Sequence, residues 1–212
     1  RPIPSGQVTT KQATIWMALQ CLISFAILIS FGPLAIALGI ASLIPVAIYP
    51  FAKRFTWWPQ IFLGIAFNWG ALLAYVAVAG DLSAAPIFLY LSGIAWTLFY
   101  DTIYAHQDKE DDALIGIKST ARLFGSNTAV WLKRFIIMSV VLFAGAIIEA
   151  LIGGSVLSLV VALGAAWAIG WHMTWQLSRL DIDNPENCMM LFRSNRDAGL
   201  LAALFLAISV FL

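Results

Sequence analysis

The sequence has 212 residues, of which 61% are hydrophobic and only 11% are charged, and its formal net charge is +1. Soluble domains contain roughly 45–50% apolar residues, so this composition excludes a soluble globular protein. Several uncharged stretches reach the ~20 residues that a helix needs to cross the hydrocarbon layer, whereas strands of a membrane barrel show alternating segments of ~10 residues. We therefore expect an all-α polytopic membrane protein.

Hydrophobic runs predict seven membrane spans. Turn residues at Gly32-Pro33, from Asp81 to Pro86, and at Gly153-Gly154-Ser155 predict three short connections. No internal repeat or dividing linker is evident, so residues 1–212 are expected to form a single transmembrane domain. The predicted spans are about 13–31, 33–50, 60–79, 85–105, 134–152, 156–176 and 198–212.

The charged residues predict an orientation in the membrane. All twelve Lys and Arg residues fall on one side of the seven spans, while the opposite side offers only Asp81 and, near a span end, Glu149. The positive-inside rule places the long loops in the cytoplasm or its organellar equivalent. A bacterial inner membrane and a mitochondrial inner membrane both fit this pattern.

Two aromatic residues and two cysteines have simple expected roles. Trp57 and Trp58 follow a basic pair and are predicted to anchor the chain at the membrane interface. Cys21, in an apolar run, and Cys188, in a predicted polar loop, lack CxxC spacing and are expected to be packing residues.

Five carboxylates are concentrated in twelve residues at the end of the fourth predicted span and directly after it. If the helix of that span continues past Tyr100, three of these acids share one helical face with Tyr104 at steps of three, four and seven. Such a stripe repels itself, so a cation should offset its charge. The five acids are Asp101, Asp108, Glu110, Asp111 and Asp112.

A divalent cation and neighbouring basic side chains are the two candidates for this role, and a solvated acidic loop is the third interpretation. Mg²⁺ holds few carboxylates and completes its coordination with water and phosphate oxygens, so an Asp-rich face suits a metal-bridged diphosphate. A diphosphate also needs positive side chains. Candidates on the same side are Lys53, Arg54, Lys118, Arg122 and Arg193.

Other chemistries lack their motifs. The sequence contains no GxxxxGK[ST], GxGxxG or HExxH, so NTP hydrolysis, dinucleotide binding and zinc protease chemistry have no support. His106 and His172 are not spaced as a metal pair and are expected to be polar neighbours of the helices that carry them. No nucleic-acid partner is expected.

The stretch from Tyr100 to Gly125 resembles the second Asp-rich motif of the UbiA-type intramembrane prenyltransferases, YDTxYAxxDxxDDxxxGIKSTAxLFG. Tyr49-Pro50-Phe51-Ala52-Lys53 matches the YxxxK element of this family. The resemblance extends over the whole chain, through "RPIPSG" at its start and "CMMLFRSNRDAGLL" near its end. The YDTxYA and GIKST wording resembles the members that prenylate 4-hydroxybenzoate in ubiquinone biosynthesis.

One departure from the family pattern is large. The family has nine transmembrane helices and a first motif of the NDxxDxxxD type before the Arg-Pro of "RPIPSG", whereas this sequence has seven predicted spans and no such motif. We expect two helices and half of the metal site to be missing from the N-terminal side. For the isolated chain we predict no turnover.

The resemblance implies transfer of a polyprenyl group from polyprenyl diphosphate to the carbon ortho to the hydroxyl of 4-hydroxybenzoate, with Mg²⁺ bound between the two motifs. Naphthoate, haem or chlorophyllide acceptors and, from another class, a cation-coupled transporter are the alternatives. Carried over by position, Asp108 and Asp112 are metal ligands assisted by Asp111. The diphosphate would contact Lys53, Lys118, Arg54 and Arg122. Asp101 would orient the acceptor or take its proton, and Tyr49 and Tyr104 would orient these groups or face the carbocation. Arg193 and Asn195 would contact substrate or support the structure.

Overall fold

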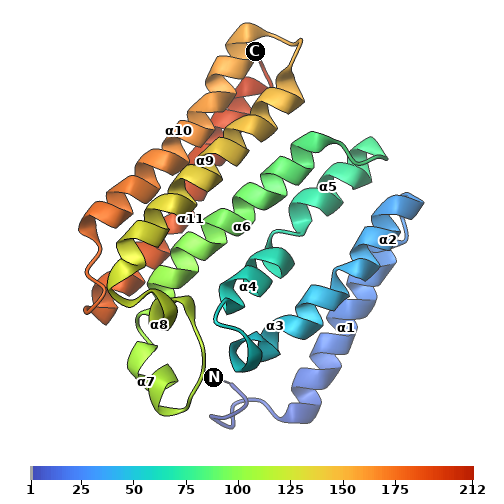
Figure 1. Cartoon of the computed structure of the whole chain (residues 1–212). Coiled ribbons are helices and arrows are strands. Elements are labelled where there is room, and N and C mark those ends of the chain that lie inside the picture. The colour runs from blue at the N-terminus through green and yellow to red at the C-terminus, as the bar shows by residue number, and fades with distance from the viewer. Residues whose placement is uncertain (1) are drawn as a thin grey trace.

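The computed structural model describes residues 2–212, so Arg1 of the predicted basic face lies outside the described residues. Within that range all regular secondary structure is helical, without a strand (Figure 1). The helices are α1 (Thr10–Leu28), α2 (Pro33–Ala41), α3 (Leu43–Phe55), α4 (Pro59–Phe67), α5 (Gly70–Ala79), α6 (Ala84–Ala105), α7 (Lys109–Leu114), α8 (Thr120–Phe124), a 3₁₀ turn (Gly125–Asn127), α9 (Thr128–Leu151), α10 (Val156–Arg179) and α11 (Pro185–Ser209).

Four long helices, α6, α9, α10 and α11, pack against one another and hold most of the core (Figure 1). Leu132 of α9, Ile169 of α10 and Leu191 of α11 are almost completely buried there. Small residues let the helices approach closely, as membrane bundles require in the absence of a strong hydrophobic driving force. A Cβ on Gly170 would lie only 2.8 Å from Val140 of the neighbouring helix.

The N-terminal helices pack more loosely. The pair α4–α5 lies along α6, α3 contacts α4, α2 contacts α5, and α1 contacts α2 at the edge of the molecule (Figure 1). The 19 residues of α1 include no buried residue, whereas α10 buries side chains along most of its length. An apolar helix without a buried face fits a lipid environment, because lipid tails satisfy its side chains as well as protein does.

Five helical stretches are long and apolar enough to cross a membrane: Thr10–Leu28, Pro33–Phe55, Pro59–Ala79, Thr120–Leu151 and Val156–Arg179. The predicted span 85–105 lies within α6, and the predicted span 198–212 is helical as far as the end of α11 at Ser209, but these two helices fall outside that set. Each includes a polar end, and α11 begins thirteen residues before the predicted span, at Pro185. The chain is therefore an all-α, multi-pass membrane bundle.

Two predicted spans are interrupted helices. The span at 33–50 breaks at Ser42 between α2 and α3, and the span at 60–79 breaks at Asn68-Trp69 between α4 and α5. The Asn68 amide donates to the carbonyl of Gly64 at 2.8 Å and to Thr97 Oγ1 of α6 at 2.9 Å. These bonds satisfy polar groups that a helix break exposes within a membrane.

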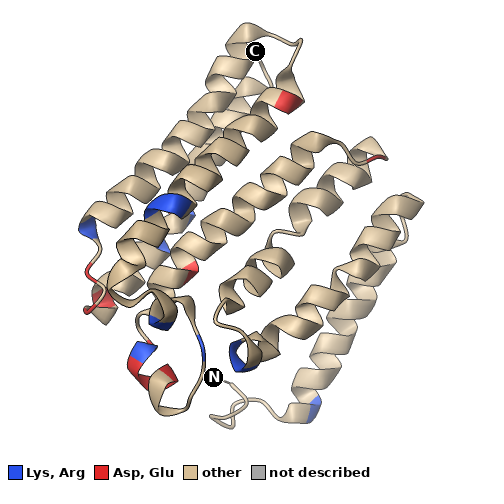
Figure 2. Ribbon diagram, viewed as in Figure 1, with Lys and Arg blue, Asp and Glu red and all other residues tan. Residues whose placement is uncertain are grey.

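Charged residues gather at one end of the bundle, where α3, α7, α8 and the start of α9 meet (Figure 2). The turn between α5 and α6, which carries Asp81, and the end of α9, which carries Glu149, lie at the opposite end (Figure 1). The distribution agrees with the predicted alternation of spans. It also brings the Asp-rich stretch to the same end as the Lys-Arg pair of α3.

Candidate functional site

The Asp-rich stretch does not continue the helix that precedes it. α6 ends at Ala105, and the backbone N–H groups of His106 and Gln107 bond three residues back, to Ile103 and Tyr104. Such bonds tighten the last turn, and Asp108 then has φ −102° and ψ 8° before α7 begins at Lys109. The prediction of one helical stripe from Asp101 to Ile115 is therefore wrong.

The short helix α7 divides the acids between two environments. Asp108, Glu110 and Asp111 are exposed, whereas Asp112 is buried. Asp112 Oδ2 lies 3.3 Å from Lys53 Nζ at the end of α3. The structure thus joins the YxxxK element and the second Asp-rich motif, which are 59 residues apart in the chain.

The loop after α7 is fixed against α3 by backbone and side-chain bonds. Gly116 has φ +73°, a conformation that favours glycine, and the loop then runs back so that the Lys118 N–H donates to the Lys53 carbonyl at 3.0 Å. Lys118 Nζ donates to the carbonyl of Phe55 at 3.3 Å. Lys53 and Lys118 are therefore held side by side at the charged end.

Arg122 fastens this loop from α8. Ser119 is the N-cap of α8, and its hydroxyl accepts the Arg122 N–H. The Arg122 guanidinium donates to the carbonyls of Asp112, at 3.2 Å, and of Ile117. Arg122 thus stabilises the turn that carries Asp112, in addition to contributing positive charge.

Trp57 is a part of this region whose contacts the sequence reasoning missed. Its ring lies beneath Lys118 Nζ, 5.9 Å from the centroid, and beneath the Arg122 guanidinium, at 5.4 Å. The position of Trp57 four residues after Lys53 was the available signal, but it was interpreted as interfacial anchoring. Trp58 is partly buried and packs against Phe124 and Trp131 at the edge of the core.

Arg54, unlike Lys53, lies outside this contact network. Its guanidinium is exposed and lies 5.9 Å from the ring centroid of Phe51, one turn earlier on α3. Arg54 therefore adds positive charge to the same end of the bundle without contacting the Asp-rich stretch.

Asp101 lies one turn before the end of α6 and is partly buried. Lys53 is the cation that acts on it electrostatically, and Asp101 acts in turn on Tyr49 and Tyr100. Tyr104 packs against Phe192 of α11 with ring centroids 4.6 Å apart. Asp101 and Tyr104 therefore lie in the last part of α6, before the loop and short helix that carry Asp112. Lys53 is the cation that Asp101 and Asp112 share.

Buried polar contacts brace the base of this region. The Thr120 N–H donates to Gln60 Oε1 at 3.3 Å, and the hydroxyls of Thr120 and Thr102 lie 2.7 Å apart. These bonds join α4, α6 and α8 directly beneath the Lys118 loop. These bonds explain why the Ser and Thr of the GIKST sequence are buried and not exposed to solvent.

His106, just past the end of α6, is 5% exposed. Burial, assisted by Lys109, lowers its pKa to about 4 although Asp183 opposes the shift, so the ring is neutral at pH 7. The Thr128 hydroxyl donates to Gly125, so its oxygen accepts from His106 Nε2 at 3.2 Å. His106 is therefore a structural link to α9, as expected for a polar neighbour.

Arg193 and Asn195 belong to α11 rather than to a loop. Asn195 Oδ1 accepts the indole N–H of Trp96 at 2.9 Å, which ties α11 to α6. Arg193 borders an open cavity of about 510 Å³ beside Gln107 and Met190. Neither residue contacts Asp112 or Lys53 within the hydrogen bonds of the described chain.

Cys188 also lies within α11 and not in the predicted polar loop. It is completely buried and its Sγ donates to the carbonyl of Asp181 at 3.4 Å. Burial, together with Asp181 and Asp183, raises the pKa of this thiol to about 11. Cys188 is therefore an unreactive packing residue, as expected, whereas Cys21 is exposed on α1.

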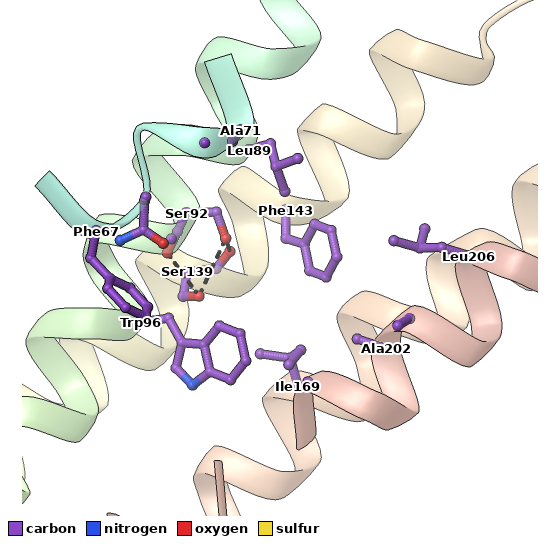
Figure 3. A pocket seen from close by; sticks show the side chains of 15 residues that line it. Phe67, Ala71, Leu89, Ser92, Trp96, Ser139, Phe143, Ile169, Ala202 and Leu206 are labelled. Atoms are coloured by element: carbon purple, nitrogen blue, oxygen red, sulfur yellow. Dashed lines mark hydrogen bonds between the residues drawn. The ribbon is translucent and has the colours of Figure 1, made fainter. Parts of the chain in front are cut away.

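An apolar cavity of about 370 Å³ lies deeper in the bundle, between the α4–α5 break and helices α6, α9, α10 and α11. Trp96, Phe143 and Leu206 surround it, and the paired hydroxyls of Ser92 and Ser139 lie on one wall (Figure 3). A second apolar cavity of about 280 Å³ shares Leu89, Phe143 and Leu206 with it. The two cavities are therefore adjacent, with these side chains between them.

Within residues 2–212, no three His, Cys, Asp or Glu side chains converge as a metal site. The oxygen donors of Asp108, Asp111 and Asp112 nevertheless have the chemistry that Mg²⁺ prefers. Mg²⁺ is usually held by one or two carboxylates together with water and substrate phosphates, so a convergent set of three is not required. The exposed acids and the nearby lysines fit a metal–diphosphate pair.

Comparison with known proteins agrees with this arrangement. Residues 1–196 match the model of the UbiA prenyltransferase family. The chain is 45% identical over 202 residues to "4-hydroxybenzoate polyprenyltransferase, mitochondrial" of Bos taurus, covering 95% of this chain and 53% of that protein. The protein of the same name from Rattus norvegicus is 46% identical over 209 residues, covering 98% and 54%.

The chain thus spans about half the length of the curated relatives it matches. A solved structure, "Apo structure of a UbiA homolog from Aeropyrum pernix K1", superposes with a TM-score of 0.74 at 22% identity, covering 99% of this chain and 76% of that chain. This likeness shows that the two chains share a fold. The family match over most of the sequence, together with these relatives, shows that the chain belongs to the UbiA prenyltransferase family.

Proposed function

We propose that the protein transfers a polyprenyl group from polyprenyl diphosphate to the carbon ortho to the hydroxyl of 4-hydroxybenzoate, the reaction for which its relatives are named. The observation that carries this proposal is the contact of Lys53 with Asp112 at 3.3 Å. It places a cationic element and an oxygen-donor element together at one end of an apolar bundle. A diphosphate with an apolar tail requires this combination.

The basic residues of the site would bind the diphosphate. Lys53, Lys118 and Arg122 lie around the Asp112 turn and would offset negative charge as it develops on the leaving group. Asp108, Asp111 and Asp112 are the proposed ligands of Mg²⁺, which when bound would neutralise further phosphate charge. Arg54, exposed on the next position of α3, would add long-range attraction.

The proposed reaction breaks the bond between the prenyl carbon and the diphosphate oxygen, and the bonding electrons leave with diphosphate. The ring carbon ortho to the hydroxyl forms the new carbon–carbon bond, and the ring proton is then lost. We assign proton acceptance or acceptor orientation to Asp101, with Tyr49 and Tyr104 beside it. The apolar space past Trp96 would exclude water that otherwise quenches the carbocation.

We also propose that residues 1–212 belong to a single transmembrane prenyltransferase domain, with its site on the face that carries the lysines and arginines (Figure 2). By the positive-inside rule this face is cytoplasmic in a bacterial inner membrane or faces the matrix in a mitochondrial one. The mitochondrial names of the relatives favour the second setting.

The test is product formation by membranes that contain the intact protein, supplied with polyprenyl diphosphate, 4-hydroxybenzoate and Mg²⁺. Asp112→Asn should lower the rate by about 10²–10³-fold, the range expected for loss of one electrostatic contact in an active site. Chelation of divalent cations should abolish the reaction. Chromatography of the product identifies the acceptor.

Glu110→Gln is the matched control, because Glu110 lies on the same helix and the substitution removes the same charge from an exposed position. It should retain most of the activity. Equal loss in both variants would show a general effect of loop charge, and unchanged activity of Asp112→Asn would refute the metal assignment. Prenylation of another aromatic acceptor alone would refute the substrate assignment.

A further inference from the structure

The outer surface of the bundle has a groove between α9 and α10, distinct from the internal cavities. Its volume is about 360 Å³. Ile137 and Val141 of α9 form one wall, and Trp167 and Trp171 of α10 form the other. Gly170 lies at the contact between the helices, where a Cβ would come within 2.8 Å of Val140.

The walls of this groove are open to the surroundings. Ile137 and Trp167 are each 64% exposed, and the indole rings of Trp167 and Trp171 stack with centroids 6.3 Å apart. Because α9 and α10 both belong to stretches apolar enough to span a membrane, the open side faces lipid. Stacked rings offer a rigid apolar wall to a chain lying beside them.

Two cations lie at the charged end of the groove. Lys133 precedes Ile136 and Ile137 of the groove by three and four residues, so it lies on the same face of α9, one turn nearer the charged end. Arg134 is the next residue, with its guanidinium 4.6 Å from the ring centroid of Trp131. Both are exposed, and neither takes part in a salt bridge among residues 2–212.

The spacing of these features matches an amphiphile. Val141 follows Lys133 by eight residues, which is about 12 Å along a helix. We propose that the α9–α10 groove binds an anionic phospholipid of the surrounding bilayer, with its phosphate at Lys133 and Arg134 and an acyl chain along Trp167 and Trp171. The inference does not depend on the proposed prenyl transfer.

Charge favours a lipid over a second copy of the chain. In a two-fold symmetric dimer through this groove, each Lys133 would approach the same patch of the partner copy, and like charges would meet. The acid of α9, Glu149, lies near the end of the helix, whereas Lys133 lies near its start, so Glu149 cannot neutralise these charges. A phosphate from the lipid layer supplies the missing negative charge.

The experiment is native mass spectrometry of the detergent-purified protein titrated with phosphatidylglycerol or with phosphatidylcholine of the same acyl chains. We expect one phosphatidylglycerol to be retained in preference to phosphatidylcholine. Lys133→Gln should weaken its retention about fivefold, and the double variant Lys133→Gln/Arg134→Gln further, since a basic residue near an anionic membrane contributes about this factor. Ile137→Trp, which fills an exposed part of the groove, should also reduce retention.

Two matched variants provide controls. Arg179→Gln removes a positive charge at the same end of α10, but this guanidinium lies over Trp175, away from the groove. Leu157→Trp adds an exposed indole near the other end of α10. Neither should change phosphatidylglycerol retention. The proposal would be overturned if both lipids were retained equally, or if the control variants reduced retention as much as Lys133→Gln and Ile137→Trp do. A dimer that Ile137→Trp converts to a monomer would also overturn it.

Discussion

The two halves of this bundle are built differently. In α6, α9, α10 and α11, side chains such as Leu132 and Met173 are completely buried, whereas α1 has no buried residue and α2 has only Ala35. The C-terminal helices are continuous, while α2–α3 and α4–α5 are interrupted. The C-terminal half is therefore well packed, whereas the N-terminal half, α1 to α5, has few internal contacts.

The candidate site joins these two halves. Asp112 follows α6 of the packed half, Lys53 ends α3 of the open half, and the Lys118 N–H bonds to the Lys53 carbonyl. Polar contacts at the charged end thus hold α3 in place in addition to its packing against α4. Residues that we assign to diphosphate binding therefore also connect the two halves of the bundle.

Truncation of matched leucines in the two halves tests the contrast most strongly. Leu132→Ala should lower the free energy of unfolding by about 2–5 kcal/mol, because it removes a fully buried side chain and leaves a cavity. Leu22→Ala on α1 should change it by less than about 0.5 kcal/mol, because Leu22 is exposed. Unfolding in detergent, followed by circular dichroism, measures both values, and a large effect at Leu22 would contradict an open first half.

Hydropathy and turn residues were sufficient to predict the helical membrane class and the three short connections. Lipid requires that backbone groups be satisfied within each segment, so long apolar runs carry a strong signal. The interruption at Asn68 could not be predicted in this way. It depends on Thr97, a residue 29 positions away on another helix, that accepts from the Asn68 amide.

The candidate site was predicted in composition but not in geometry. The end of α6 at Ala105 has no glycine or proline to signal it, and the helical stripe of acids was expected to continue. Gly116, by contrast, marks a real change of direction with φ +73°. Pairing of Lys53 with Asp112 depends on how α3 returns to the loop, which local sequence does not determine.

Substitution of Lys53 tests whether the polar contacts hold the two halves of the bundle together. Lys53→Gln should lower the free energy of unfolding by about 1–2 kcal/mol, because buried Asp112 loses its partner. The effect should stay below that of a fully buried pair because the Lys53 side chain is 40% exposed. Thermal unfolding and trypsin cleavage after Lys109 or Lys118 measure the loss of stability and of loop order.

Arg54→Gln is the neighbouring control, since Arg54 is exposed and forms no salt bridge among residues 2–212. Its stability should be close to that of the unchanged protein. Combining Lys53→Gln with Asp112→Asn should restore part of the stability, because the buried charge is then removed as well. Additive losses in the double variant would show that the two side chains do not interact.

Substitution of Trp57 should produce the smallest effect. It tests whether the positions of Lys118 and Arg122 matter in addition to their charges. Trp57→Leu keeps Lys118 and Arg122 but removes the ring beneath them, which is worth about 0.5–1 kcal/mol at an exposed site. In the intact protein, KM for polyprenyl diphosphate should therefore rise about two- to fivefold with little change in kcat, and Trp57→Phe should recover part of the loss. Arg122 remains bonded to the carbonyls of Asp112 and Ile117, so the loop itself should persist. Trp16→Leu, an exposed tryptophan of α1, is the control. An equal rise in KM for that variant would assign the effect to membrane anchoring, because Trp16 belongs to the open half and has no cation above its ring among the described contacts.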